Sequence, residues 1–426
     1  MSSDSFNPKQ RSLHLFDQPP LLKSWLICIT ASLLFFYEFI QINSMNSLNP
    51  FLASDLHLSA MTISTISSVY FIANVALLPV SGMLLDRFST KLLIVIAMIF
   101  CTLGTFLFGL AHAMPLFLLS RALIGFGGAF CFLGAFRIAT RWFVPARLAQ
   151  ITGVITTMAM LGGLVGQQPA VYLIKAFGWR HALFIDAGLG VFFTVLIAFV
   201  VIDSPDRQRL LDERKHALQH GIIESLKKVV FKGQIWLGAI YGCLLNLVIY
   251  VIAALWGLRY LTDTYHLSMI TASHISSLIL VGSILGSPII GFLNDYIAYK
   301  RTLMFVSALL TFIAMLSLLV IQQNILTLSI AFFCLGFFSS AQIMAYPHAA
   351  KQIEPAFQAS ATSIVSTCML GSTAFMQPVF AWLMVAGNKH AHPVIYHYNY
   401  AMSALAVCLA VSVLLSFVID IHNKKH

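Results

Sequence analysis

The stretch GMLLDRFSTK at residues 82–91 decides the fold, because a second version of it, GFLNDYIAYK, follows 209 positions later at residues 291–300. Other residues recur at the same offset: Pro79 as Pro288, Gly127 as Gly336, Met160-Leu161-Gly162 as Met369-Leu370-Gly371, and Gln168-Pro169 as Gln377-Pro378. Coincident leucines would mean little in an apolar chain, whereas coincident Pro, Gly, Asp, Lys and Gln-Pro are informative. The pattern predicts a duplicated unit of about 200 residues.

The composition indicates an integral membrane protein. Of the 426 residues, 59% are hydrophobic and only 9% are charged, and the mean hydropathy is +0.87. A soluble domain carries about 25% charged residues. An apolar run of about 20 residues can cross the bilayer as a helix. The sequence contains twelve such runs: 24–48, 60–84, 92–111, 115–139, 149–173, 181–202, 234–260, 270–293, 302–321, 325–348, 358–384 and 397–419.

The distribution of charge predicts the orientation. We divide the chain into a tail, six spans, a polar linker, six further spans and a second tail, with bounds 1–23, 24–202, 203–233, 234–419 and 420–426. With the N-terminus inside, 20 of the 25 Lys and Arg residues fall in cytoplasmic segments and four in outer segments. This positive-inside bias predicts a multi-pass protein of the cell inner membrane with both termini cytoplasmic. It also explains the net charge of +10 without a nucleic-acid partner.

Several classes of function are not supported by the sequence. The seven cysteines lie inside apolar runs without pairing or metal-binding spacing, so we expect no disulfide framework, metal or cofactor. There is no phosphate-binding Gly-x-x-x-x-Gly-Lys-Ser/Thr motif, which argues against an ATP-driven pump. No nucleophile–base arrangement emerges, and we do not expect an enzyme.

The repeated stretch resembles the loop signature of the major facilitator superfamily, which lies between helices 2 and 3 and again between helices 8 and 9. Arg121-x-x-x-Gly125-x-Gly127 resembles the helix 4 motif of that family. The resemblance implies an all-α integral membrane fold of twelve transmembrane helices in two pseudo-symmetric six-helix bundles. It also implies gating roles for the signature residues of both copies: Gly82, Asp86, Arg87, Lys91, Gly291, Asp295 and Lys300. Thr90 and Tyr296 depart from the family pattern, because each stands where a basic residue is usual.

Glu38 is the candidate proton-coupling residue. It lies near the middle of the first span, where an ionisable side chain is costly and usually marks a pathway. Tyr37, Glu38, Gln41 and Ser44 share an arc of roughly 120° on that helix. The resemblance places helices 1, 4, 7 and 10 around the central cavity, which would direct this arc toward substrate. The alternative is a buried structural carboxyl tied to a neighbouring helix.

Further polar residues are candidates for binding a polar solute. They are Tyr37 and Gln41 in the first span, Gln168 and Gln377 before the repeated prolines, Asn246 and Tyr250 in the seventh span, and Gln342 and Tyr346 in the tenth. The alternative is that they hydrogen-bond between helices for structure or mark simple kinks. Arg121 lies deep enough to need a partner or water. The resemblance places Asp186 on peripheral helix 6, which favours a structural role.

The resulting prediction is a secondary active transporter that moves a small polar metabolite, such as an amino acid or nucleoside, by proton-coupled uptake and alternating access. Phe36-Tyr37-Glu38-Phe39 and Arg141-Trp142-Phe143 are among the motifs that resemble a branch of small-nutrient importers of intracellular bacteria. The expected partners are the substrate, protons and the lipid bilayer, and we expect a monomer. The alternatives are a drug or siderophore efflux transporter and a non-transporting membrane sensor.

Overall fold

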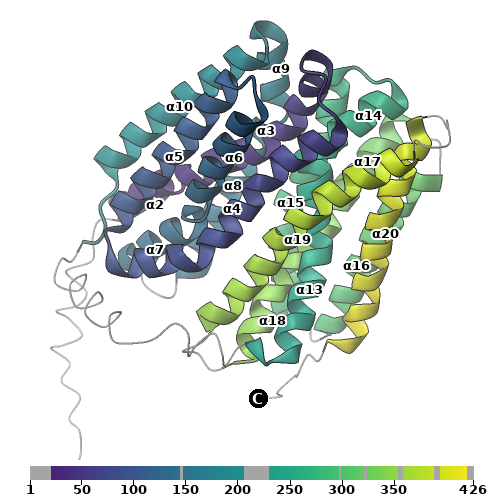
Figure 1. Ribbon diagram of the computed structural model, residues 1–426. Coiled ribbons are helices and arrows are strands. Elements are labelled where there is room, and N and C mark those ends of the chain that lie inside the picture. Colours follow the sequence, from purple (N-terminus) through teal and green to yellow (C-terminus); the bar gives the residue numbers. More distant parts are fainter. Residues whose placement is uncertain are drawn as a thin grey trace, which may run out of the picture.

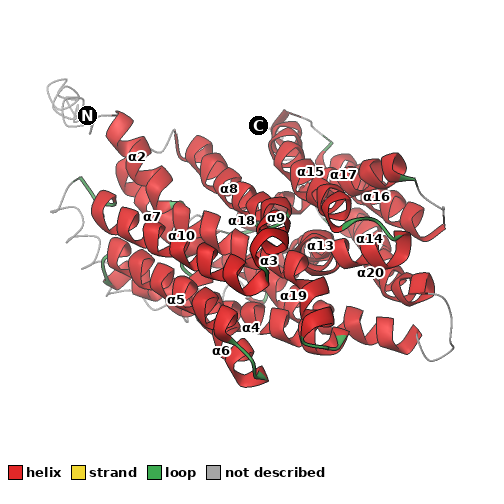
Figure 2. Ribbon diagram, turned by 90° about the horizontal axis from the view of Figure 1, so that it is seen from above, coloured by secondary structure: helices red, strands yellow, loops and turns green. Residues whose placement is uncertain are grey.

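The computed structural model describes residues 21–143, 147–205, 230–296, 299–320, 324–353, 358–387 and 394–419. Within these residues, eleven helices are long and apolar enough to cross a membrane. The helices form two groups that are far apart in sequence, residues 21–200 and residues 233–418, and Figure 2 shows the groups side by side. The predicted all-α membrane architecture is confirmed. The limits of the linker stay a prediction, since residues 206–229 lie outside the described part of the chain.

The helices of the first half cover the six spans predicted for it (Figure 1). Three of them are interrupted: α2 and α3 form the first span, α6 and α7 the fourth, and α8 and α9 the fifth. The bounds are α2 Leu21–Ala31, α3 Leu33–Asp55, α4 Ala60–Arg87, α5 Thr90–Leu110, α6 Met114–Gly128, α7 Cys131–Trp142, α8 Leu148–Val165, α9 Gln168–Phe177 and α10 Trp179–Val200.

The second half repeats this order. Its seventh span contains a π-helical stretch, η2, between two α-helices, and its tenth span contains a short 3₁₀ turn, η3. The bounds are α13 Gly233–Leu247, η2 Val248–Trp256, α14 Gly257–Tyr265, α15 Met269–Tyr296, α16 Lys300–Val320, α17 Ile325–Ser339, η3 Ser340–Met344, α18 Ala345–Lys351, α19 Gln358–Gly387 and α20 Val394–Val418.

The fifth predicted span, 149–173, is broken between α8 and α9. Gln167 interrupts the helix with φ −99° and ψ −94°, and a proline follows within the first turn of α9, where its missing N–H costs nothing. The hydroxyl of Ser47 lies 3.0 Å from the carbonyl oxygens of Gly166 and of Gln167. These freed backbone groups are thereby satisfied inside the protein, as the bilayer requires.

The duplication is visible in the backbone. His57 and His266, 209 positions apart, both adopt the left-handed conformation, with φ of 51° and 52°. Two residues later, Ser59 and Ser268 accept hydrogen bonds from the backbone N–H groups of Thr62 and Thr271. The helices that follow, α4 and α15, have the same length and carry a proline at the same place. The repeat read from the sequence therefore reports two copies of one fold.

The helices pack closely where small residues allow it. A Cβ atom on Gly162 would lie 1.9 Å from the carbonyl oxygen of Phe36, which ties α8 to α3. In the same way, Gly125 of α6 approaches α4, and Gly336 of α17 approaches α15. Helices α7 and α18 lie at one end of the molecule, which we call the terminal face, and α9 and α14 lie at the other, the far face (Figure 1).

Candidate functional site

The carboxyl group of Glu38 is held inside the first half by neutral donors. Glu38 lies on α3 and is 3% exposed. It accepts a hydrogen bond from the Tyr70 hydroxyl and another, at 3.3 Å, from Nδ2 of Asn74. Tyr70 and Asn74 are four residues apart on α4, so the helical repeat places both on the face that meets α3. In the described part of the chain, Glu38 forms no ion pair.

The end of α6 leaves room for this group because residue 128 is a glycine. A Cβ atom there would lie 2.5 Å from Oε1 of Glu38, 2.6 Å from Nδ2 of Asn74 and 2.8 Å from the Tyr70 hydroxyl. No side chain fits at such distances. The backbone of Gly128 therefore borders the carboxyl site, and the absence of a side chain there leaves the space that the three polar groups occupy.

Arg121 lies on the other side of Tyr70. Its guanidinium sits over the Tyr70 ring, 5.1 Å from the centroid, and Nη1 donates to the carbonyl of Gln41 at 3.1 Å. Arg121 is 2% exposed, and its Nε and Nη2 atoms have no hydrogen-bond partner. One aromatic ring thus separates a buried cation from a buried carboxyl. Sequence reasoning saw that Arg121 needs a partner, but it did not include the residue in the site.

Gln41 and Tyr37 face the interior of the first half. Nε2 of Gln41 donates to Oδ2 of Asp186 at 2.6 Å. The Tyr37 hydroxyl lies 3.1 Å from the carbonyl of Asp186 and 3.3 Å from Oγ1 of Thr105. The two residues therefore join α3 to α10 and α5. Asp186, for which the resemblance implies a structural role on peripheral helix 6, thus contacts the middle of α3.

The polar residues of the second half are only partly paired. The Tyr346 hydroxyl lies 3.2 Å from Oγ of Ser366, and Nδ2 of Asn246 reaches the carbonyl of Met369 at 3.5 Å. Gln342 is 8% exposed, and its Oε1 has no partner. The Tyr250 ring crosses to the first half, where it packs against Phe39 and Phe71 at 6.3 and 5.5 Å between centroids.

The glutamines near the repeated prolines contact the seventh span. Nε2 of Gln377 donates to the carbonyl of Tyr250 at 2.8 Å. In the first half, the corresponding contact is made by Gln167, which donates to the carbonyl of Ala253 at 3.0 Å. Gln168 is only half-buried, at the start of α9. The sequence repeat pairs Gln168 with Gln377, and the helix break at Gln167 is what moves the contact by one residue.

The residues around the Glu38 carboxyl have no equivalents in the second copy of the fold. At the repeat offset, Glu38 corresponds to Leu247 and Tyr70 to Ile279. The helix α17, which corresponds to α6, contains no charged residue. Because the second half adopts the same fold without them, this polar cluster is not a requirement of the fold.

The signature residues lie where α4 ends and α5 begins, and where α15 ends and α16 begins. The backbone N–H of Lys91 donates to Oδ1 of Asp203 at 2.6 Å, and Nη1 of Arg141 donates to Oγ1 of Thr90 at 2.9 Å. Gly82 has open space at its missing side chain, and Gly291 has Ile343 at 3.7 Å. Lys300 begins α16. The side chains of Asp86, Arg87 and Asp295 lie outside the described residues.

Comparison with known families agrees with this architecture. The family description "Major Facilitator Superfamily" matches residues 30–268 and 239–426. The chain belongs to the major facilitator superfamily. Members of this superfamily to which the chain is similar are named as transporters, and the apolar helices of the described residues make the chain a multi-pass membrane protein.

Individual relatives are distant. A probable sulfoacetate transporter of Cupriavidus necator is 23% identical over 279 residues, which cover 63% of this chain and 64% of that protein. The chain thus spans less than two thirds of the length of this relative. A bacterial homolog of the human lysosomal transporter Spinster superposes with a TM-score of 0.75 at 16% identity, over 94% of this chain and 98% of that one. A D-xylose-proton symporter gives 0.74 at 15%, over 95% and 99%.

Proposed function

We propose that this superfamily member takes up a small polar metabolite by alternating access and that protons entering through Glu38 drive the uptake. The observation that carries the proposal is the Glu38 carboxyl, which is buried at mid-span and held by neutral donors only. An unpaired carboxylate is costly in the low-dielectric interior of a membrane, and binding a proton removes that cost. A carboxyl that must gain or lose a proton as its surroundings change can couple proton flow to transport.

The substrate class is supported by the polar side chains of the second half. Gln342 presents an unpaired acceptor, and Tyr250 spans the boundary between the halves. The relative named as a sulfoacetate transporter and the neighbour named as a D-xylose-proton symporter both handle small polar solutes. We place the protein in the inner membrane with its terminal face in the cytoplasm, on the positive-inside distribution. Drug or siderophore efflux is the competing function.

The test is uptake into liposomes across an imposed pH gradient. Glu38→Gln mimics the protonated carboxyl, so it is expected to abolish proton-driven accumulation while preserving downhill exchange of substrate. Asp55→Asn is the matched control, because it makes the same chemical change at the exposed end of the same helix. Full accumulation by Glu38→Gln would reject Glu38 as the proton carrier. A wild type that is indifferent to the gradient would reject proton coupling.

The substrate is identified by a thermal-shift screen of amino acids, nucleosides, sugars and dicarboxylates. A ligand at 100 times its Kd stabilises the protein by about 2.7 kcal/mol. The same screen separates transport from a sensor role when it is followed by uptake of each hit. Binding without movement of any hit would favour a sensor. Net transport of a hit outward, away from the cytoplasmic side of the membrane, would favour efflux.

A further inference from the structure

The two halves are joined near the far face by three side-chain amides of the first half, which bind backbone groups and two side chains of the second half. Five hydrogen bonds connect described residues of the first half with described residues of the second. Nδ2 of Asn46 donates to Oγ of Ser276 at 2.8 Å, and its Oδ1 accepts from the N–H of Leu258 at 2.9 Å. Nδ2 of Asn49 donates to the carbonyl of Leu255 at 2.8 Å, and its Oδ1 accepts from Arg259 at 3.2 Å. Gln167 supplies the fifth, to Ala253.

Four of these five bonds reach the seventh span, two at its π-helical stretch and two just after it, and the remaining bond reaches Ser276 of α15. Residues Val248–Trp256 form the π-helix η2, and α14 continues from Gly257. At a change of helix type the regular pairing of N–H and C=O groups is interrupted, and buried backbone groups then need other partners. The carbonyls of Ala253 and Leu255 and the N–H of Leu258 obtain those partners from α3 and from the break in the fifth span.

The gripping side chains have no access to water in this state. Asn46, Asn49 and Gln167 are each 0% exposed. A buried amide that lost its partner without gaining water would be strongly unfavourable. Separation of the halves at this end would break all five bonds together and would hydrate both sets of groups. Two states of this contact are therefore favourable in free energy: a closed state with all five hydrogen bonds formed, and an open state in which water binds the separated groups. A partly separated state, in which buried amides have neither partner, is costly.

We propose that Asn46, Asn49 and Gln167 are gating residues that hold the far face closed by gripping the backbone of the seventh span. The proposal rests on the alternating access of the proposed function and adds the residues that set its equilibrium. Neutral amide–backbone bonds suit this role because water replaces them at little net cost, so the gate stays reversible.

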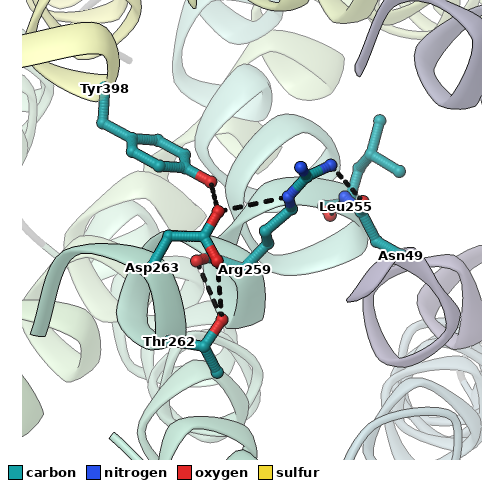
Figure 3. A network of polar contacts seen from close by, with 6 residues as sticks. All are labelled: Asn49, Leu255, Arg259, Thr262, Asp263 and Tyr398. Atoms are coloured by element: carbon teal, nitrogen blue, oxygen red, sulfur yellow. Dashed lines mark hydrogen bonds and ion pairs between the residues drawn. The ribbon is translucent and has the colours of Figure 1, made fainter. Parts of the chain in front are cut away.

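The gate is braced against the last span. Arg259, which contacts Asn49, also pairs with Asp263 at 3.2 Å between Nε and Oδ2 (Figure 3). The same Oδ2 accepts a hydrogen bond from the Tyr398 hydroxyl of α20 at 2.9 Å. Movement of α3 away from α14 would therefore release Arg259, which pairs with the carboxylate that ties α14 to α20.

The test measures the gate without substrate. Spin labels are placed on cysteines at Ala113 and Leu326, exposed positions at the far-face ends of α6 and α17, after the native cysteines have been replaced. Pulsed electron paramagnetic resonance gives the distribution of distances between the labels. Gln167→Ala and Asn49→Ala are expected to raise the ratio of long-distance to short-distance molecules by roughly two- to tenfold for each bond lost.

Gln377→Ala is the matched control, because it removes an equivalent amide from a carbonyl of the same π-helix but within one half. It should leave the distance distribution unchanged. An equal shift in Gln377→Ala would mean that loosening of η2, and not the bond between the halves, sets the distance, and would overturn the proposal. Unchanged distances in folded Gln167→Ala and Asn49→Ala protein would also overturn it.

A milder variant covers the case in which these substitutions prevent folding. Arg259→Gln acts on a partly exposed side chain and removes the contact with Asn49 from the second half. It should also increase the long-distance population, and an unchanged distribution would reject the role of the Asn49 contact. Because the measurement uses neither substrate nor a pH gradient, it stands apart from the Glu38 uptake assay. Either result can fail while the other holds.

Discussion

Gly128→Ala tests the carboxyl site without changing any group that hydrogen-bonds in it. The new methyl carbon would lie 2.5 Å from Oε1 of Glu38, and contacts of that kind are essentially never shorter than 3.0 Å. The carboxyl must therefore retreat by about 0.5 Å, a shift of the size that overpacking imposes. Nδ2 of Asn74 and the Tyr70 hydroxyl, at 2.6 and 2.8 Å from the same methyl carbon, must shift as well, so the hydrogen bonds among the three groups are disturbed.

The energetic consequence has two opposing parts. Overpacking of this kind costs about 1–3 kcal/mol. Replacing glycine by alanine inside a helix returns about 0.5–1 kcal/mol. The net expectation is a loss of up to about 2.5 kcal/mol in stability, together with a displaced Glu38 and weakened proton-driven accumulation. Gly188→Ala on α10 is the control, because nothing lies within 4 Å of its new methyl group.

The assay compares thermal unfolding and uptake driven by a pH gradient for both variants. Gly188→Ala should unfold at the same or a higher temperature and should accumulate substrate like the wild type. Gly128→Ala should unfold earlier and accumulate less, while its downhill exchange persists. If Gly128→Ala matched Gly188→Ala in both measurements, the packing of the carboxyl site would be unconnected with coupling, and the reasoning from its geometry would be refuted.

Three further predictions follow from the same structure and sequence. A cysteine at Ser204 should resist an impermeant thiol reagent in whole cells and one at Asn388 should react, whereas the reverse pattern would invert the predicted topology. Asp86→Asn should slow transport strongly in protein that still folds and inserts, because the family resemblance implies that this carboxylate meets a helix N-terminus of the other half, a contact that contributes about 0.3–1 kcal/mol or more. Asp295→Asn should matter less because Tyr296 departs from the signature, and wild-type rates in Asp86→Asn would remove the gating role. Gln342→Ala should raise KM by up to about tenfold at unchanged stability, because it removes an unpaired acceptor, and an unchanged KM would exclude Gln342 from the solute site.

The spans and the duplication could be predicted because they depend on local properties. Apolar runs of bilayer length are visible in one dimension, and so are coincidences of Pro, Gly and Asp at a fixed offset. The interruption of the fifth span could not be placed in this way. Gln167 differs little from its neighbours in sequence, and the backbone conformation there depends on Ser47 of another helix, which satisfies the freed carbonyls.

The site was predictable only in part for the same reason. Glu38 is conspicuous as a charged residue inside an apolar run. Its donors Tyr70 and Asn74 are ordinary polar residues of another helix, and the rotation of α4 against α3 is what makes them partners. The arc that groups Tyr37 with Glu38 is correct as helix geometry. Packing against α5 and α10 nevertheless directs Tyr37 to different partners from those of Glu38.

The duplicated fold carries unequal chemistry in its two halves, and the kinds of groups involved explain how this is possible. The proposed proton site takes Glu38, Tyr70 and Asn74 from the first half, and the proposed gate takes its three amides from the same half. In the second half, the partners of the gate side chains are mainly backbone groups of η2 and α14, which almost any sequence supplies. At the positions of Glu38 and Tyr70, the second copy has Leu247 and Ile279. In this division, the first half supplies both the proposed proton-binding carboxyl and the gate side chains, and the second half supplies mainly the backbone groups to which those side chains bond. Proton binding and opening of the far face would therefore both act on the same helix, α3.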